Sequence, residues 1–441
     1  MWSPYVMPFI SHLGVRSYYR VTVAGARVPV TGPVLLVANH NNSLVDPALV
    51  VVAADRNVRF LTKAPLFDNK LIGWLIRAVG SVPVYRKQDD PTKLAQNLDS
   101  FRDVHAVLAE GHAVGIFPEG ISHSAPQLAP LKTGAARIAI GAGQRLGHDF
   151  PIIAMGLVFR DRDAFRSEAH VIITEPFRWE DQLRAGVSDR EAVRELTQRI
   201  EKAMRSVTLN LARWEDEPVV RAAEAVWSAE FGAEEDEAAR IARLALATDA
   251  LQALRGGGDP AWREVAVELK AHARQLRQLD LTPATLKDGA GFAEAVEWSV
   301  SRIPLVVTLP ISLFGALVFW FPKWITSRAA AALAVAEGPD ALVTYRILVG
   351  GVAFLAWFLV VAAAVAIVAD PAWGLLVLLV QPLWAFGALA VGERRAQAWE
   401  SVRRFFLRRT EGPRLEAMRV RQRRLAHRLR TLYEQVGAAA R

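Results

Sequence analysis

The stretch that decides the fold is residues 34–47, VLLVANHNNSLVDP, in which an apolar run leads straight into a histidine and then an aspartate. Residues 113–120, AVGIFPEG, have the same form, with an apolar run that ends in a glutamate and a glycine. Short apolar runs bounded by Gly and Pro are typical of buried strands. Residues just beyond the carboxyl ends of strands line the ligand crevice of an open α/β sheet. The two stretches therefore predict one cleft that receives an imidazole, two carboxylates and a glycine turn.

Seven strands with helices between them are predicted from residue 20 to residue 178. The apolar runs that mark the strands lie at 20–24, 34–38, 58–62, 81–85, 113–117, 151–157 and 169–174. The clearest intervening helix starts at Asp90-Pro91, an N-cap followed by proline in the first helical position. Its apolar face repeats at helical spacing, at Leu94, Leu98, Phe101, Val104 and Leu108. This alternation predicts an α/β domain over 20–178, with a mixed sheet flanked by helices.

The composition limits the classes of function. With 441 residues the chain suits two or three domains, and its net charge of +8 indicates an anionic partner. No RNA- or DNA-binding motif of the usual kinds is present, so we expect lipid and phosphate as partners, and no nucleic acid. The absence of cysteine excludes disulfides, thiolate metal sites and a cysteine nucleophile. The first residues, MWSPY, lack the basic and apolar regions of a signal peptide, so we expect the N-terminal domain to stay cytoplasmic.

Two segments flank the predicted α/β domain. Residues 1–19 are rich in aromatic side chains, which fits either an interfacial segment resting on lipid headgroups or a helix packed on the core. Residues 179–300 lose the strand pattern and are predicted to form a helical appendage. Its first helix follows a capping-box pattern at 188–191, SDRE. We find no chemistry in this appendage.

A membrane region is predicted at 301–392, where three stretches lack charged residues, at 303–322, 347–369 and 371–392. A helix needs about 20 apolar residues to cross a bilayer, so each stretch is long enough. The tail, residues 393–441, is dense in arginine and should remain cytoplasmic. An even number of crossings keeps both the catalytic domain and the tail in the cytoplasm. We therefore expect a helical hairpin in the cytoplasmic (inner) membrane from the last two stretches, with the first re-entrant or interfacial.

The tail also carries an apolar stripe with alternating spacings of three and four residues, at Leu415, Met418, Gln422, Leu425, Leu429 and Leu432. Such a stripe fits either a coiled-coil seam, which would let two copies associate through residues 414–433, or a helix lying on anionic lipid. The nearby hairpin favours the lipid surface. Binding of nucleic acid by the surrounding arginines is the weakest of the three interpretations.

His40 is the histidine best placed for catalysis, because it follows a predicted strand directly and precedes Asp46 by six positions. A carboxylate beside a histidine fixes its tautomer and stabilises the imidazolium, which is the usual arrangement of a general base. Asp46-Pro47 also has the form of a helix N-cap followed by a first-turn proline. On spacing alone both interpretations of Asp46 stand.

Several other residues are candidates for the same cleft. Glu119 sits in a turn closed by Gly120 and is suited to orienting a hydroxyl or binding a backbone amide. Arg86 and Lys132 are cations that could clamp a phosphate, although a surface ion pair explains Arg86 equally well. Residues 120–124, GISHS, nearly form a nucleophile elbow but lack its second glycine, which leaves a serine-type hydrolase using Ser122 as a weaker alternative. No Walker loop, zincin helix or dinucleotide fingerprint is present.

Four blocks together carry a resemblance to a known family: 39–47, 80–86, 117–120 and 151–157. In this order and spacing they resemble the glycerolipid acyltransferases of the lysophosphatidate acyltransferase superfamily. Five residues separate His40 from Asp46, where the superfamily usually has four, and Ser122-His123 follows the third block. Both features resemble its glycerol-3-phosphate/dihydroxyacetone-phosphate acyltransferase branch. Ile121 and Ser122 replace the Thr-Arg of the usual third block, so Arg86 and Lys132 become the better phosphate ligands.

The resemblance implies acyl transfer from a thioester, acyl-CoA or acyl carrier protein, to a hydroxyl of glycerol 3-phosphate or its 1-acyl form. His40 would deprotonate the hydroxyl and Asp46 would orient His40, with Glu119 as the third catalytic residue. Expected substrate contacts are Asn39, Arg86, Gly120, Ser122, His123 and Lys132. No metal or cofactor besides the acyl donor is implied. The alternatives are a lysophospholipid-remodelling acyltransferase and a non-catalytic membrane-surface scaffold.

Overall fold

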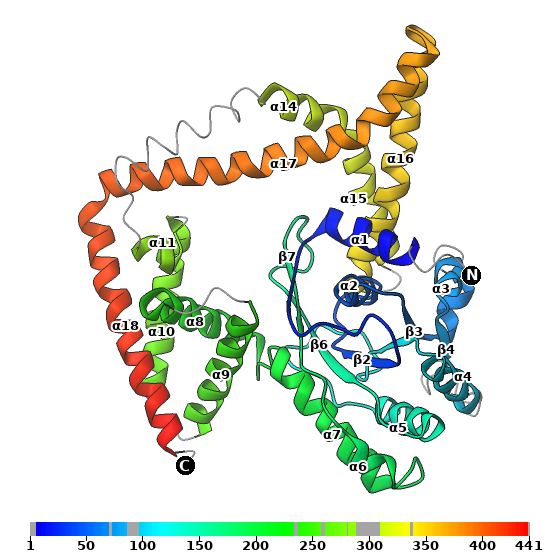
Figure 1. Ribbon diagram of the computed structural model, residues 1–441. Coiled ribbons are helices and arrows are strands. Elements are labelled where there is room, and N and C mark those ends of the chain that lie inside the picture. Colours follow the sequence, from blue (N-terminus) through cyan, green and yellow to red (C-terminus); the bar gives the residue numbers. More distant parts are fainter. Residues whose placement is uncertain are drawn as a thin grey trace. The chain divides into compact units, whose positions relative to one another are not determined.

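The computed structural model describes residues 6–69, 73–85, 97–232, 237–256, 261–279, 281–287, 309–335 and 338–439. These residues divide into two compact units (Figure 1). The first unit comprises Met1–Trp214, Glu235–Ala245 and Ala334–Ile347, and the second comprises Glu215–Glu234, Leu246–Leu333 and Leu348–Arg441. The first unit therefore continues past residue 178, where the sequence pattern had placed the end of the α/β domain.

The first unit contains a seven-stranded sheet, and all seven predicted strands are present. The strands are β1 (Arg20–Gly25), β2 (Val34–Ala38), β3 (Val58–Lys63), β4 (Val82–Val84), β5 (Ala113–Ile116), β6 (Ile152–Phe159) and β7 (Glu168–Ile173). Their order in the sheet is β1-β7-β6-β2-β5-β3-β4. Neighbouring strands are parallel except β6 and β7, which are antiparallel, so the sheet is mixed as predicted.

Strand β2 lies at the centre of the sheet, and all five of its residues are buried. It pairs in parallel with β5 on one side and with β6 on the other. The carboxyl ends of these three strands therefore meet at one edge, which is where residues 39–46 and 117–124 continue. Gly115 of β5 is needed for this packing, because a Cβ there would lie 2.3 Å from Cε1 of Phe60.

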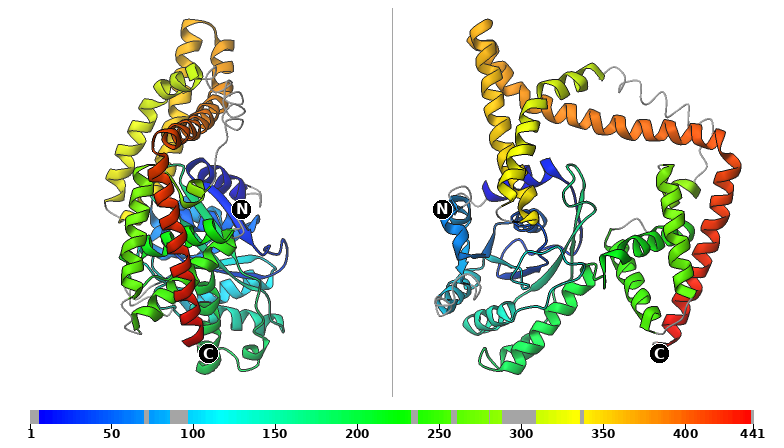
Figure 2. Two further views of the ribbon diagram at one scale, coloured as in Figure 1. Left: turned by 90° about the vertical axis from the view of Figure 1, so that its left-hand side faces the viewer. Right: turned by 180° about the vertical axis from the view of Figure 1, so that it is seen from behind.

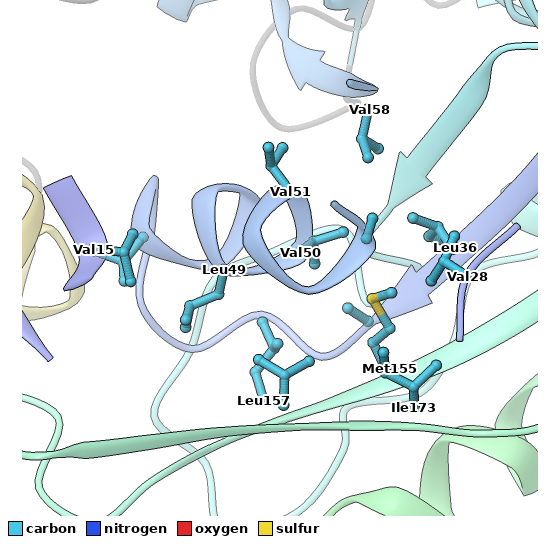
Figure 3. Close-up of a cluster of buried hydrophobic side chains, with 14 of the residues drawn as sticks. Val15, Val28, Leu36, Leu49, Val50, Val51, Val58, Met155, Leu157 and Ile173 are labelled. Carbon is cyan, nitrogen blue, oxygen red and sulfur yellow. The ribbon is translucent and has the colours of Figure 1, made fainter. Parts of the chain in front are cut away.

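Helices cover both faces of the sheet (Figures 1 and 2). Those of the first unit are α1 (Val6–Tyr18), α2 (Val45–Ala54), η1 (Ala64–Asp68), α3 (Gly73–Ala78), α4 (Asn97–Ala109), α5 (Gly134–Leu146), α6 (Glu180–Leu183) and α7 (Arg190–Val207). Helices α1 and α2 lie on one face, and α5 and α7 on the other. Under α2, Leu49 and Val50 pack with Leu36, Met155 and Leu157 to form the core (Figure 3).

Two helices of this unit test details of the sequence prediction. Helix α4 buries Val104 and Leu108 as expected, while the predicted start at Asp90-Pro91 lies outside the described residues. Helix α7 is capped by Asp189, whose carboxylate accepts the N–H groups of Glu191 and Ala192, so the cap is one residue later than the SDRE pattern suggested. The buried face of α7 packs on β6, which explains why the unit extends beyond residue 178.

The second unit contains a helical bundle built from α8 (Glu217–Phe231), α10 (Ala261–Gln278), α11 (Pro283–Lys287) and α18 (Gly412–Ala439). The elements η3 (Trp214–Asp216) and α9 (Glu237–Gly256) belong partly to each unit. Residues Leu425 and Leu432 of α18 cluster with Val219 of α8 and Leu269 of α10, and Leu415 and Met418 cluster with Leu276, Leu279, Leu281 and Leu286. The stripe that we expected to face lipid or a second copy is therefore covered within the chain.

A buried polar residue of α18 is satisfied inside this bundle. Gln422 is fully buried, and its amide nitrogen donates to Oε1 of Glu230 at 2.8 Å and to the carbonyl of Pro283 at 3.1 Å. Its amide oxygen lies 3.2 Å from Nε2 of His272, whose pKa is lowered by burial. A polar position at the seam of a helix pair commonly fixes register, and here the partners that it selects belong to the same chain.

The remaining helices of the apolar region are α14 (Leu309–Val318), α15 (Trp320–Ala334), η4 (Pro339–Ala341), α16 (Leu342–Val368) and α17 (Pro371–Thr410). Two segments, Leu342–Val368 and Pro371–Val391, are long and apolar enough to cross a membrane, and few of their residues are buried. The predicted helical hairpin is therefore present, turning at Asp370, whose carboxylate accepts the N–H of Ala372 at 2.8 Å. Whether the hairpin crosses a membrane stays a prediction.

Contacts within the hairpin hold α14, α16 and α17 together. The amide nitrogen of Gln381, a buried residue of α17, donates to the carbonyl of Phe358 at 3.1 Å. Phe314 of α14 stacks on Trp384 of α17 with a centroid separation of 5.1 Å. Helix α14 has ten residues, which at about 1.5 Å per residue span only about half of a 30 Å bilayer core. Residues 303–308 of the first apolar stretch lie outside the described residues.

Candidate active site

His40 and Asp46 meet, as predicted. Nδ1 of His40 lies 2.8 Å from Oδ2 of Asp46, and the Asp46 side chain is fully buried. The same Oδ2 atom accepts the backbone N–H groups of Asn41 at 2.7 Å and Asn42 at 2.6 Å. The carboxylate is therefore held at a fixed place in the turn before it meets the imidazole.

The structure shows that Asp46 is not a helix cap. Helix α2 begins at Val45, and its N-cap is Leu44, whose side chain makes no capping hydrogen bond. Asp46 lies in the first turn, and its carboxylate faces back onto residues 40–42. The five-residue gap is accommodated by Ser43, which adopts a left-handed conformation with a φ of 43°.

These contacts define the tautomer of His40. Because Oδ2 of Asp46 already accepts two backbone N–H groups, it acts as an acceptor, and Nδ1 of His40 is the donor. Nε2 of the neutral ring then carries a lone pair. The ring stacks on Phe117 with a centroid separation of 4.2 Å and keeps 20% of its side chain exposed. The imidazole of His40 is thus partly exposed and is oriented with Nδ1 toward Asp46.

Glu119 holds the backbone of His40 in place through hydrogen bonds. Its Oε1 atom accepts the backbone N–H of His40 at 3.0 Å, and its Oε2 atom accepts the N–H of Ala129 at 2.7 Å and faces Nε2 of His123 at 2.5 Å. The residue is only 2% exposed. The carboxylate therefore positions the backbone of His40, and the expected contact of Glu119 with the acceptor stays a prediction.

His123 also helps to hold the backbone of His40, through a contact with Glu119 and a hydrogen bond of its own. Its Nδ1 atom accepts the N–H of Ala125 at 3.0 Å, so the ring proton lies on Nε2 and is donated to Glu119. Its own backbone N–H donates to the carbonyl of His40 at 3.0 Å. The N–H of His40 is held by Glu119 and its carbonyl by His123. His123 was expected to contact substrate, and the structure gives it a positioning role.

Two further expected substrate contacts also serve the scaffold. The amide of Asn39 pairs with the backbone of Leu157 through both ends, at 3.0 Å from its nitrogen and 2.7 Å from its oxygen. This pairing joins the residue that follows β2 to β6. The hydroxyl of Ser122 accepts the N–H of Ser43 at 3.4 Å, so it links the two turns.

Lys132 lies at the site as predicted. Gly120 has a φ of 71° and closes the turn through a hydrogen bond from its N–H to the carbonyl of Phe117. A Cβ at Gly120 would lie 2.4 Å from Nζ of Lys132, so the ammonium group rests directly over this glycine. Lys132 is exposed, and its charge is available to an anionic ligand. Arg86, the other predicted cation, lies outside the described residues.

The sequence interpretation missed Arg162, which joins both turns of the site. Arg162 follows β6, and its Nη1 atom donates to the carbonyl of Asn41 at 3.1 Å and to the hydroxyl of Ser124 at 2.5 Å. Its Nε atom pairs with Asp163 at 3.2 Å. The available signal was the charged run DRD at 161–163, directly beyond a strand that ends at the same edge as β2.

Tyr19 is a second positioning residue that the sequence did not reveal. Its hydroxyl accepts from the side-chain amide of Asn42 at 2.9 Å and donates to the backbone carbonyl of Arg162. Burial raises the pKa of Tyr19, so the hydroxyl remains protonated and keeps its donor. In the described ranges, no cluster of three or more His, Asp or Glu side chains is placed to hold a metal ion.

Comparison with known proteins finds a family model that matches part of the chain. The family model described as Acyltransferase matches residues 20–158. These residues form an acyltransferase-family domain. The acyltransferase domain contains His40, Asp46, Glu119 and Lys132, and it ends one residue before the carboxyl end of β6.

Relatives of the acyltransferase domain include two curated proteins. Over 147 residues the chain is 32% identical to glycerol-3-phosphate O-acyltransferase 1 of Saccharomyces cerevisiae. The aligned region covers 32% of this chain and 19% of the yeast protein. Over 82 residues the chain is 34% identical to 1-acyl-sn-glycerol-3-phosphate acyltransferase of Bacillus subtilis. This aligned region covers 19% of this chain and 37% of that protein. The chain thus spans less than two thirds of either relative.

A solved structure also matches this part of the chain. It is the 1-acyl-sn-glycerophosphate acyltransferase PlsC from Thermotoga maritima, at 21% identity and a TM-score of 0.34, covering 46% of this chain and 78% of that one.

Proposed function

We propose that this protein is a membrane-bound O-acyltransferase that moves a fatty acyl group from acyl-CoA or acyl carrier protein to glycerol 3-phosphate or 1-acylglycerol 3-phosphate. One observation carries the proposal. Within an acyltransferase-family domain, His40 is oriented by the buried Asp46 so that Nε2 is the free nitrogen of a partly exposed ring. The names of the yeast and Bacillus relatives support these two acceptors.

In the proposed reaction, Nε2 of His40 takes the proton of the acceptor hydroxyl as its oxygen attacks the thioester carbonyl carbon. The new C–O ester bond forms and the C–S bond breaks. The departing thiolate receives the proton that His40 holds, which returns the imidazole to its neutral form. Asp46 stabilises the imidazolium between these steps. A positioned base of this kind typically contributes about 10²–10⁴-fold to the rate.

The phosphate of the acceptor needs a cation near His40. Lys132 supports this role, because its ammonium group rests over Gly120, next to the residue whose carboxylate holds His40. Arg86 remains the second proposed phosphate ligand, on the strength of its position in the sequence. Lysophospholipid remodelling is the alternative within the same chemistry, and it differs only in the acceptor.

We also propose that the protein sits in the cytoplasmic membrane, with the acyltransferase domain and tail on the cytoplasmic side. The apolar hairpin of α16 and α17 supports attachment. Helix α1 supports it too: Val15 and Tyr18 are buried in the core, while Phe9 is 67% exposed and Leu13 is 50% exposed. One face of α1 is therefore core and the other is free to rest on anionic lipid.

The direct test of the proposed function is purified protein in lipid vesicles, supplied with labelled acyl-CoA or acyl carrier protein. The acceptor panel contains glycerol 3-phosphate, its 1-acyl form and a lysophospholipid without a terminal phosphate. Mass measurement of the products identifies the acceptor. We expect the phosphate monoesters to be acylated fastest. Acylation of the third acceptor alone would favour remodelling, and no product from any acceptor would contradict the proposal.

The serine-hydrolase alternative predicts a different outcome for Ser122. Because its hydroxyl only accepts a backbone N–H of Ser43 at 3.4 Å, we expect Ser122→Ala to retain acyl-transfer activity within about threefold, the loss of one weak hydrogen bond. Labelling with a fluorophosphonate probe is the second measurement, and we expect none at Ser122. A covalent adduct on Ser122 together with an inactive Ser122→Ala variant would overturn this prediction.

A further inference from the structure

The start of helix α16 is built into the first unit, although it lies far along the sequence from the acyltransferase domain. Residues Ala334–Ile347 belong to that unit. Val343 is completely buried and is part of the core cluster that contains Val15 and Leu49. Ile347 packs at the edge of the same cluster, and its Cγ2 atom would lie 3.3 Å from a Cβ at Gly14 of α1.

Thr344 directly contacts the turn that runs from His40 to Asp46. Its hydroxyl accepts the backbone N–H of Leu44 at 3.2 Å, and the residue is only 6% exposed. Leu44 is the N-cap of α2, and no side chain of α2 itself caps that helix. A helix start needs partners for its free N–H groups, and here α16 supplies one of them. Leu44 lies two residues before Asp46, within the turn that starts at His40.

Arg346 reaches the same turn by a second route. Its Nη1 atom donates to the hydroxyl of Tyr18 at 2.9 Å and to the carbonyl of Asp163. Tyr18 also donates to that carbonyl at 2.8 Å. The neighbouring residue, Arg162, donates to the carbonyl of Asn41 and to the hydroxyl of Ser124. Arg346 therefore fixes the loop from which Arg162 joins the two turns of the site.

We propose that residues 342–347, the first turns of α16, are a working part of the active site, in which Thr344 and Arg346 are positioning residues for the His40–Asp46 pair. The inference rests on the proposed function for the role of that pair. It assigns a catalytic consequence to a helix that, by composition, is a candidate membrane span. The segment acts through the turn and contacts no reacting atom.

The first experiment compares two substitutions of Thr344 in the full chain. Thr344→Val removes the acceptor at nearly constant volume, and Thr344→Ser keeps it. We expect kcat to fall about tenfold in the valine variant, since a small displacement of a catalytic group is costly, with the KM for the acyl donor unchanged. The serine variant should restore kcat to within about twofold. Equal kcat values for valine variant and wild type would overturn the proposal.

A matched control separates positioning from general loss of a threonine hydroxyl. Thr197 of α7 is partly buried, and its hydroxyl bonds only along its own helix, to the carbonyl of Val193 at 2.7 Å. Thr197→Val should leave kcat unchanged. A fall in kcat of the same size in both valine variants would overturn the specific role of Thr344.

A second measurement detects the contact between α16 and α1 by chemical cross-linking. The natural chain contains no cysteine, so Gly14→Cys with Ile347→Cys introduces a single pair at the contact described above. Mild oxidation should join this pair within one molecule, because a Cβ at residue 14 lies 3.3 Å from the Cγ2 position of residue 347, which a cysteine sulfur can take, and this places the two cysteines within reach of a disulfide. Phe9→Cys with Ile347→Cys is the control, because Phe9 lies on the exposed face of α1.

The two outcomes of this cross-link are distinct. The docked position of α16 is supported if the 14–347 pair joins efficiently and the 9–347 pair does not. The protein used must be active after the disulfide is reduced. Absence of the 14–347 cross-link in such active protein would overturn the proposal. Efficient joining of the 14–347 pair, together with wild-type protein that transfers no acyl group to any acceptor, would instead contradict the proposed function.

Discussion

The Asp46→Asn variant should lose about 10²–10⁴-fold in kcat, with little change in the KM for the acyl donor. An amide can still accept the N–H groups of Asn41 and Asn42, which Oδ2 accepts at 2.7 and 2.6 Å. It has no charge with which to stabilise the imidazolium of His40. Steady-state kinetics on both the acceptor and the donor measure the effect.

The control for this prediction lies on the same helix. Asp55 follows the last residue of α2, its side chain is 92% exposed, and its left-handed φ of 49° is tolerated by asparagine. Asp55→Asn should therefore behave as wild type. An Asp46→Asn enzyme with a kcat within about twofold of wild type would show that the charge of this carboxylate has no part in the reaction.

Glu119→Ala should lower both stability and kcat. The carboxylate is buried and receives donors from His40, Ala129 and His123. Leaving buried donors without an acceptor costs about 1–3 kcal/mol for each group, so we expect the free energy of unfolding to fall by about 3 kcal/mol or more. Because the backbone of His40 loses its anchor, kcat should also fall about 10²-fold.

Glu119→Gln should not rescue this loss. The amide nitrogen that would replace Oε2 would face two donors, the N–H of Ala129 and Nε2 of His123. His123 cannot turn its lone pair toward this nitrogen, because its Nδ1 atom already accepts from Ala125. Glu110→Ala, at an exposed carboxylate in the same unit, is the control and should change neither quantity. Full activity in Glu119→Gln would contradict the role of Glu119 in positioning His40.

The strands were predictable because their signal is local. Each of β2, β5 and β6 is an apolar run whose length and boundaries are visible in the sequence, and burial on both sides makes such a run continuous. The meeting of His40 and Asp46 followed from the same logic, since both lie just past β2. The edge of the sheet brings Glu119 to them from β5.

The roles of individual polar side chains were not predictable, because they depend on partners distant in sequence. Asn39 pairs with Leu157, and Glu119 accepts from Ala129 and His123, so both side chains join segments of the chain that the sequence does not show to be neighbours. Asp46-Pro47 has the sequence pattern of a helix cap. In the structure, however, the carboxylate of Asp46 accepts hydrogen bonds from two N–H groups of the preceding turn.

The apolar stripe of α18 shows the same limit on a larger scale. Its spacing correctly predicted one apolar face on a helix. The identity of the surface opposite that face is not encoded in the stripe, and it proved to be α8 and α10 of the same chain. In the same way, the apolar run after residue 347 revealed α16 but not its first turns, where Thr344 and Arg346 are polar residues with partners in the acyltransferase domain.

The central claim, that His40 is the base, is tested most directly by the rate of acyl transfer in His40→Ala, measured with and without added imidazole. The substitution leaves the face of Phe117, on which the ring now stacks at 4.2 Å, open to a free imidazole beside Asp46. We predict that the variant alone is slower by about 10³-fold and that imidazole restores part of the rate. Acyl transfer by His40→Ala within about twofold of wild type, without imidazole, would contradict the account.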